Sequence, residues 1–276
     1  MENVPRRFFT NKLGLTGTII VGVVLIIAVG APWIAPYEPA AQSTGDPLSP
    51  PSRSHWFGTD ELGRDILSRV VYAARIAVLV GMLSTFLAAA VGIPIGLITG
   101  YYGGWLDSIV MRVTDAWLAF PIMVLALAIS AAMGPGLTNA IIAIAFVSIP
   151  GYIRLARGQT LVVKAREFIE AARVIGQINA VILYRYVLPN ISSVLIVQAS
   201  LTTASAILTE SALSFLGVGV MPPNPSWGAM LSNAQPFLSR APWMAIAPGA
   251  SIFLLVMGIN LAGDGLRDAL DPKIYR

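Results

Sequence analysis

Long stretches without a charged residue dominate this chain. Such runs cover residues 13–37, 76–106, 116–153, 186–209, 211–239 and 241–263, and each exceeds the roughly 20 residues that cross a bilayer as a helix. The run 116–153 is broken by Met133-Gly134-Pro135-Gly136 and holds two helices, whereas the run 211–239 is broken by a proline-rich segment and is mostly loop. The pattern predicts an all-α polytopic membrane protein with six transmembrane helices, at about 13–35, 76–100, 116–133, 137–155, 191–217 and 243–262.

Composition agrees with a protein that is embedded in a lipid bilayer. Hydrophobic residues make up 56% of the chain and charged residues 12%, against about 25% charged residues in a soluble domain. Basic residues precede the first apolar run, as they do in a signal peptide. That run is longer than the 7–15 residues of a signal sequence, so we interpret it as an uncleaved first helix.

The distribution of Lys and Arg predicts the orientation. Placing the N-terminus in the cytoplasm puts most of the 18 basic residues on that side, which the positive-inside rule favours. Both termini are then cytoplasmic. The net charge of +4 reflects this topology and does not indicate nucleic-acid binding. The absence of cysteine and the single histidine leave no constellation of residues for a metal or redox site.

One long polar stretch, residues 154–189, interrupts the apolar pattern. It reads as two short helices joined at Gly176, because glycine ends a helix without a Cβ penalty. Arg166 and Glu170 are spaced for an i,i+4 pair, and we expect Pro189 to end the second helix. One face of the first helix carries Phe168, Ala171, Ala172 and Ile175.

This stretch resembles the EAA loop of ABC importer permeases, whose coupling helices dock into a groove on a cytoplasmic ATPase subunit. Two positions depart from the peptide-type pattern: Gln177 stands where a small residue is usual, and Tyr186 stands where His is usual. The resemblance implies that the coupling loop 156–190 contacts an ATPase. It rests on Glu170, Ala171, Ala172, Gly176, Leu188, Pro189 and Asn190.

The predicted external loop, residues 36–75, contains a second string with a family resemblance. His55-Trp56-Phe57-Gly58-Thr59-Asp60, followed by Gly63-Arg64-Asp65, is similar to the segment before the second helix of dipeptide, oligopeptide and nickel permeases. The charged residues Asp60, Glu61, Arg64 and Asp65 can form a local network that holds the loop over the transport pathway. The alternative is a solvated connecting loop with one aromatic side chain, Trp56, in the membrane interface.

Glu210 is the acidic residue that lies well inside a predicted span. An ionisable group in lipid is costly, so it must face the bundle, a cavity or a polar neighbour. Thr209, Ser211 and Ser214 lie beside it. These residues line the translocation pathway, or they form a hydrogen-bonded seam between helices; both interpretations stay open.

Three further expectations concern the ends of helices. Arg112 and Asp115 are spaced for an i,i+3 ion pair at the membrane edge. Trp227 is expected to anchor a short helix in the outer interface. Residues 264–276 are expected to form a short amphipathic cap on the cytoplasmic side.

Together the resemblances cover residues 55–65, 100–121, 164–190, 209–231 and 260–272. They imply the type I ABC importer permease fold of the dipeptide-type second permease. The implied divisions are an N-terminal tail (1–12), a first transmembrane helix (13–35), an external loop (36–75), a five-helix core (76–263) and the cap (264–276).

The function that the resemblance implies is import of dipeptides, oligopeptides or nickel chelates by alternating access. The chain has no G-x-x-x-x-G-K-[ST] loop, so it is expected to bind no cofactor and to have no catalytic residue, with ATP and Mg on partner subunits. The implied partners are a second homologous permease (a heterodimer), two ABC ATPase subunits and an external substrate-binding protein, in a bacterial cytoplasmic (inner) membrane. A secondary transporter and a non-transporting scaffold remain alternatives; the former would need several intramembrane ionisable residues.

Overall fold

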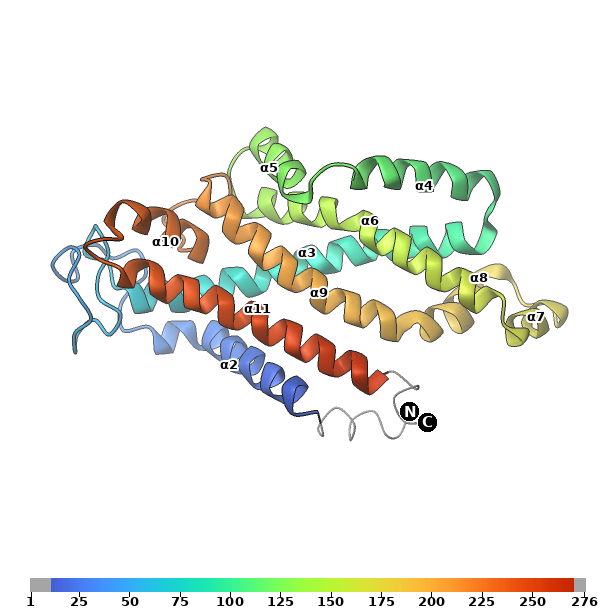
Figure 1. Cartoon of the computed structure of the whole chain (residues 1–276), viewed down its shortest axis with the longest axis horizontal. Coiled ribbons are helices and arrows are strands. Elements are labelled where there is room, and N and C mark those ends of the chain that lie inside the picture. Colours follow the sequence, from blue (N-terminus) through green and yellow to red (C-terminus); the bar gives the residue numbers. More distant parts are fainter. Residues whose placement is uncertain (1–10, 271–276) are drawn as a thin grey trace.

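The structure is a computed structural model and describes residues 11–270. The described chain is helical, and Thr59 and Asp65 form an isolated antiparallel bridge. Residues 1–10 of the predicted tail and 271–276 of the predicted cap lie outside the described residues. The helices, shown in Figure 1, are α2 (Lys12–Ile34), α3 (Ile66–Tyr102), α4 (Gly104–Leu118), α5 (Ile122–Met133), α6 (Leu137–Lys164), α7 (Glu167–Val174), α8 (Asn179–Val181), a π-helical turn (Ile182–Val187), α9 (Leu188–Phe215), α10 (Trp227–Ala234), a 3-10 turn (Gln235–Phe237) and α11 (Trp243–Leu270).

Among the described residues, five helices are long and apolar enough to cross a membrane, and α4 with α5 makes a sixth span that is bent by 88°. The predicted number of spans is therefore confirmed when the bent pair counts as one. The prediction of one helix at about 116–133 is wrong, because the chain turns between Leu118 and Ile122. Pro121 causes the break, since it lacks an N–H to donate and disfavours helical geometry at the residue before it.

Several helix boundaries in the structure differ from the predicted ones. Helix α3 begins at Ile66, so the predicted external loop is shorter than 36–75, and the first turns of α3 contain Arg69 and Arg75. Helix α11 continues to Leu270, so the described part of the predicted cap is the end of that helix. The early turns of α3 tolerate charge, since Arg69 is buried and its Nη1 donates to the carbonyl of Pro39 at 3.0 Å.

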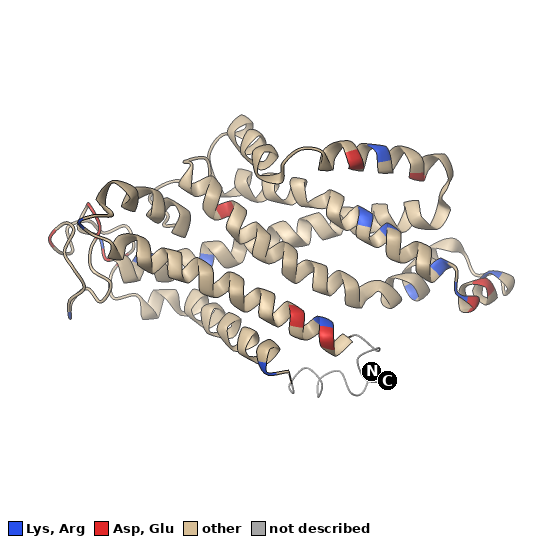
Figure 2. Cartoon of the chain, in the orientation of Figure 1, with Lys and Arg blue, Asp and Glu red and all other residues tan. Residues whose placement is uncertain are grey.

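The long helices α2, α3, α6, α9 and α11 run along the long axis of the molecule (Figure 1). Helix α7 lies at one end, and α10 lies with the 35–65 loop at the other end. The start of α2 and the end of α11 are directed toward the α7 end but stop well short of it (Figure 1). There Asn11 Nδ2 donates to Asp268 Oδ2 at 3.0 Å. Charged residues lie mostly at the two ends of the bundle, and basic residues are most numerous toward α7 (Figure 2).

Glycines allow the helices of the core to approach closely. On α3, Gly92, Gly96 and Gly100 face α6, and a Cβ at Gly96 would lie only 2.5 Å from the carbonyl oxygen of Ile153. Small residues at a spacing of four are typical of close helix pairs in membranes. The stripe therefore holds α3 against α6, the helix that ends next to α7.

Candidate functional site

Helix α7 carries the first half of the predicted coupling loop, and Gly176 ends it as expected. Gly176 has φ +79°. The N–H of Gly176 donates to the carbonyl of Arg173 at 2.9 Å, and the N–H of Gln177 donates to that of Ala172 at 3.1 Å. This pair of bonds is the Schellman motif, which favours glycine at the left-handed position.

The buried face of α7 differs from the predicted one. Ile169 and Ala172 are buried and join a hydrophobic cluster with Ile182, Val187 and Ile191. Of the predicted apolar face, Ala172 alone is buried, whereas Phe168, Ala171 and Ile175 are exposed. The expected Arg166–Glu170 ion pair does not form among the described residues. Glu170 and Ala171 are thus left on the accessible side of the helix.

An exposed apolar surface covers this end of the molecule. We call it the α7 surface, and Val174, the most exposed of its residues, has 87% of its surface accessible. Exposed apolar side chains in contiguous groups mark contact sites for other proteins. The α7 surface consists of Phe168, Val174, Ile175, Ile178 and Tyr184.

Pro189 does not end the second helix, contrary to the prediction. The chain runs as one helical segment from Asn179 to Phe215, with the π-helical turn Ile182–Val187 directly before Leu188. The wider turn accommodates a proline, whose ring would otherwise crowd the preceding turn. Asn190 Nδ2 donates to the carbonyl of Tyr186 at 2.7 Å. Leu188 and Pro189 therefore lie at the base of the loop rather than at its tip.

The four candidate pathway residues on α9 separate onto two faces. Glu210 is 1% exposed, and Ser214 Oγ donates to its Oε1 at 2.7 Å. Ser214 Oγ also accepts from the N–H of Val220 at 3.0 Å. Glu210, Ser211 and Ser214 are buried, whereas Thr209 is half-buried. The buried residues tie α9 to the chain that follows it, and Thr209 faces elsewhere.

Thr209 lines a polar cavity of about 270 Å³ between α6, α9 and the bend that joins α4 to α5. Leu118 and Ile122 contribute from the bend, and Ser148 and Gly151 from α6. From α9, a stripe of polar residues lines the cavity: Gln198, Thr202, Ser205 and Thr209.

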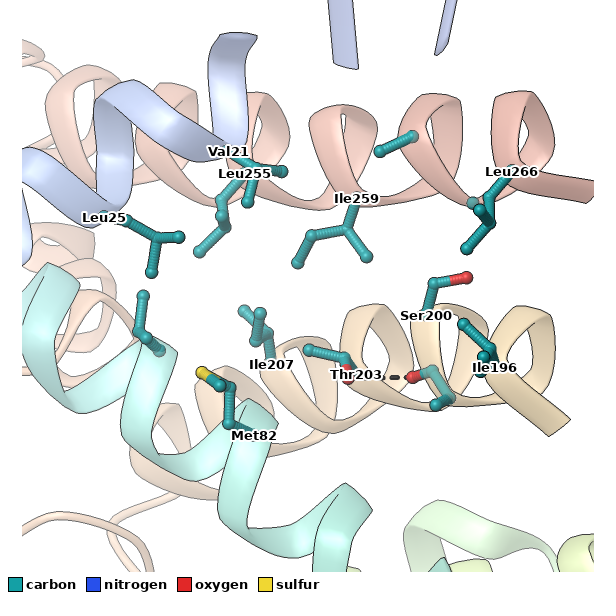
Figure 3. A pocket seen from close by; sticks show the side chains of 14 residues that line it. Val21, Leu25, Met82, Ile196, Ser200, Thr203, Ile207, Leu255, Ile259 and Leu266 are labelled. Atoms are coloured by element: carbon teal, nitrogen blue, oxygen red, sulfur yellow. Dashed lines mark hydrogen bonds between the residues drawn. The ribbon is translucent and has the colours of Figure 1, made fainter. Parts of the chain in front are cut away.

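A second cavity, of about 430 Å³, is apolar and lies between α2, α3, α9 and α11. Figure 3 shows Val21, Met82 and Ile259 among the side chains that point into it. One of its few hydroxyls, that of Thr203, is already used, because Thr203 Oγ1 donates to the carbonyl of Ala199 at 2.8 Å. Its lining suits hydrocarbon, and a peptide's polar groups would lack partners there.

The predicted charge network of the external loop forms as two separate clusters. In one, Arg64 Nε lies 2.6 Å from Asp60 Oδ2 and Arg64 Nη2 lies 3.0 Å from Glu61 Oε1. In the other, Asp65 caps α3 by accepting from the N–H of Ser68 at 2.8 Å, and its second oxygen lies 2.9 Å from His55 Nδ1.

The remaining predictions for the outer end divide between loop and core. Trp56 is 68% exposed, so its ring projects from the loop. Trp227 is buried and its Nε1 donates to the carbonyl of Val70 at 3.1 Å; the prediction of an interfacial anchor is wrong, because the indole packs against α3. Among residues 11–270, no group of three His, Asp or Glu side chains is arranged to hold a metal ion.

Ion pairs between α4 and α6 replace the predicted Arg112–Asp115 pair. Asp115 pairs with Arg154, and both carboxylate oxygens of Asp107 accept from Arg157. The prediction fails because Asp115 finds a basic partner on a neighbouring helix. These bridges join the bent span to the helix that leads into α7.

Comparison with known protein families identifies the family of this chain. A family model described as "Binding-protein-dependent transport system inner membrane component" matches residues 92–276. The chain belongs to this family. A second model, described as "N-terminal TM domain of oligopeptide transport permease C", matches residues 2–51 of the permease.

Curated relatives and a solved structure agree with this assignment. The permease is 46% identical over 264 residues to the dipeptide transport system permease protein DppC of Alkalihalophilus pseudofirmus, covering 96% of this chain and 87% of that one. It is 46% identical over 270 residues to the glutathione transport system permease protein GsiD of Escherichia coli O6:K15:H31, covering 98% and 89%. A chain of the MetNI methionine ABC transporter in an inward-facing conformation has the same fold, with a TM-score of 0.61 at 18% identity over 75% of this chain and 98% of that one.

The permease is thus a multi-pass membrane subunit of an ABC importer, with the type I permease fold. It is not the enzyme of that system, because ATPase activity belongs to separate subunits. Membership of the family implies ATPase subunits and a binding protein as partners.

Sequence reasoning missed most of the residues that line the polar cavity. It treated the hydroxyls of α9 as one group and left out Gln198. The available signal was the spacing of residues 198, 202, 205 and 209, since steps of four and three keep side chains on one helical face. The same rule places Thr203, Glu210 and Ser214 on another face.

Proposed function

We propose that the permease forms half of the membrane passage of an ATP-driven importer for dipeptides or related small solutes, among them glutathione and nickel chelates. The observation that carries this proposal is the 46% identity over nearly the whole chain to permeases named for dipeptide and glutathione transport. The external binding protein delivers the solute in this proposal. The site of action is the bacterial cytoplasmic (inner) membrane.

The α7 end is the cytoplasmic end in this proposal, and the α7 surface is the ATPase contact. The start of α2 and the end of α11 are directed toward that end (Figure 1). Basic residues are most numerous on the same side (Figure 2), which favours the cytoplasmic side. Glu170, Ala171 and Gly176 are exposed on α7 and its cap. A Cβ at Gly176 would meet nothing within 4 Å in this chain, so the space beside it is open to a partner.

The polar cavity contributes one wall of the passage. Thr209 Oγ1 donates to the carbonyl of Ser205, and Gln198 Nε2 donates to Thr202 Oγ1. The hydroxyl oxygens of the stripe and the amide oxygen of Gln198 can still accept hydrogen bonds from the N–H groups of a peptide. A second, homologous permease closes the open side of the cavity in this proposal, which gives a heterodimer. ATP and Mg bind to the partner ATPases, and ATP binding and hydrolysis move α7 as the bundle alternates between outward and inward access.

Cross-linking tests the ATPase contact directly. The chain contains no cysteine, so single-cysteine variants need no background changes. Val174→Cys is expected to cross-link to a co-expressed ATPase subunit. The control is Trp56→Cys at the other end, where the side chain is also exposed (68% against 87% for Val174). Cross-linking of both variants or of Trp56→Cys alone would contradict the assignment.

Uptake tests the transport function. The permease is co-purified with the subunits it recruits, reconstituted in vesicles with the binding protein, and assayed with labelled dipeptide and glutathione. We expect uptake only when ATP is present on the side of the membrane that the α7 end faces. Uptake that follows an ion gradient without ATP would favour a secondary transporter. A permease that purifies alone and transports nothing would favour the scaffold alternative.

A further inference from the structure

Tyr101 lies at the last turn of α3, directly beneath α7. It is buried, and it belongs to the same hydrophobic cluster as Ile169 and Ala172 of α7. A buried tyrosine needs partners for its hydroxyl. The partners come from the loop that carries α7.

Three polar residues of this loop converge on Tyr101. Its hydroxyl donates to Asn179 Oδ1 at 2.8 Å and accepts from Arg173 Nε at 3.3 Å. Lys164 Nζ donates to its backbone carbonyl. Lys164 precedes α7, Arg173 belongs to α7, and Asn179 follows it, so the contacts span the helix from one side to the other.

The same two cations also engage the ring of Tyr101. The guanidinium carbon of Arg173 lies 5.1 Å from the ring centroid, and Lys164 Nζ lies 5.5 Å from it. Both distances fall within the range for cation–π attraction. Helix α7 therefore cannot shift relative to the end of α3 without breaking hydrogen bonds and moving a cation off an aromatic face.

The end of α3 is in turn fixed to the wall of the polar cavity. Gly100, the residue before Tyr101, would place a Cβ 2.8 Å from the carbonyl oxygen of Arg157, so α3 and α6 are in backbone contact there. Helix α6 supplies Ser148 and Gly151 to the polar cavity. A contiguous packed route thus runs from α7 through Tyr101 and α3 to α6.

We propose that Tyr101 is a positioning residue that makes α3 follow the movement of α7, and so couples ATP hydrolysis to the opening of the polar cavity. The proposal rests on the proposed function, in which α7 docks on an ATPase. It assigns the coupling to a residue outside the coupling loop. The hydroxyl is the essential group, because it alone contacts both α7 and the segment after it.

The test compares Tyr101→Phe with Tyr102→Phe in the reconstituted importer. Tyr101→Phe removes the hydroxyl and keeps the ring under the two cations. Tyr102 is the adjacent residue, 55% exposed, and it loses the same atom at a surface position. Uptake and ATP hydrolysis are measured in the same vesicles, and Val174→Cys cross-linking reports docking of the ATPase.

Tyr101→Phe is expected to lower the amount of solute moved per ATP by about 2- to 30-fold, the range for residues that carry coupling between sites. Cross-linking to the ATPase is expected to persist, and Tyr102→Phe is expected to behave as the unmodified protein. Asn179→Ala is expected to lower the same ratio. The double variant Tyr101→Phe/Asn179→Ala is expected to be no worse than the more impaired single variant, because both changes remove the same Tyr101–Asn179 hydrogen bond.

Two outcomes would overturn the role of Tyr101. An unchanged ratio of uptake to hydrolysis would show that the hydroxyl carries no coupling. Loss of ATPase cross-linking together with equal losses of uptake and hydrolysis would show that Tyr101 only holds the fold of the loop. Failure of the proposed function is distinguishable from both, because the unmodified permease would then show no ATP-driven uptake.

Discussion

Helix α2 packs on α11 through glycines, and Gly17 makes one of the two tightest contacts. A Cβ at Gly17 would lie 2.4 Å from the backbone nitrogen of Ala262, 2.6 Å from the carbonyl oxygen of Gly258 and 2.7 Å from Leu261 Cβ. Two of these atoms belong to the backbone and cannot rotate away. Gly17→Ala therefore forces α2 and α11 apart.

Gly22 provides the matched control in the same helix. A Cβ at Gly22 would meet nothing within 4 Å. Both substitutions gain the same helix propensity, about 0.5–1 kcal/mol in water, so their difference isolates the clash. Overpacking costs about 1–3 kcal/mol, which makes Gly17→Ala less stable than Gly22→Ala by that amount, or about 5- to 150-fold in the equilibrium for docking of α2.

Thermal unfolding of the detergent-solubilised permease measures this difference. With about 2–4 °C for each kcal/mol in a large domain, Gly17→Ala is expected to unfold about 2–12 °C below Gly22→Ala. Amide exchange along residues 12–34 should increase in Gly17→Ala and stay unchanged in Gly22→Ala. Equal melting temperatures, or faster exchange in both variants, would refute the glycine contact as the basis of α2 packing.

Three further pairs of variants test other parts of the structure. Gly176→Asn adds bulk while tolerating the left-handed backbone, so it is expected to lower uptake per ATP with the complex intact. The control is Gly217→Asn, at a Schellman cap on the other end of the bundle, which should leave uptake per ATP unchanged. Equal uptake per ATP in both variants would contradict ATPase contact at Gly176. Glu210→Gln keeps an acceptor for Ser214 and is expected to match the unmodified protein in stability and uptake. Glu210→Ala is expected to lower the free energy of unfolding by about 1–3 kcal/mol, measured by thermal unfolding. Loss of uptake by a stable Glu210→Gln would instead place the carboxylate in the pathway. Asp107→Asn weakens the two-oxygen contact with Arg157 and should lower the melting temperature more than Asp115→Asn, whose ion pair with Arg154 is exposed; the reverse order would contradict this account of the α4–α6 contact.

The charge-free runs predicted the spans well, and their ends poorly. Helix α3 starts ten residues before the predicted position at 76, because Arg69 is buried with its Nη1 donating to the carbonyl of Pro39 at 3.0 Å. Arg75 lies over the ring of Tyr72. A partner that lies 30 residues away along the chain leaves no local pattern, so a rule based on charge ends the helix too early.

The candidate site shows a similar division. Its location followed from local signals, and Gly176 ends α7 because a left-handed cap needs glycine. The role of Pro189 did not follow, because a π-helical turn that accommodates the ring depends on how the segment packs. The faces of α9 were predictable in principle, since Thr209 and Glu210 are adjacent and must point in different directions.

The structure indicates why this permease works as part of an assembly with other subunits. Apolar side chains along α2, α3 and α11 are exposed, which suits contact with lipid. The apolar cavity of Figure 3 lies among those helices and α9. The α7 surface is different, because it lies beyond Lys164, where the long helix α6 ends. Val174 and Ile175 face water unless a protein covers them, while Ile169 and Ala172 hold the same helix firmly to its own chain. A helix that is anchored on one face and uncovered on the other is suited to transmit force from a partner, and Tyr101 is where that force would enter the bundle.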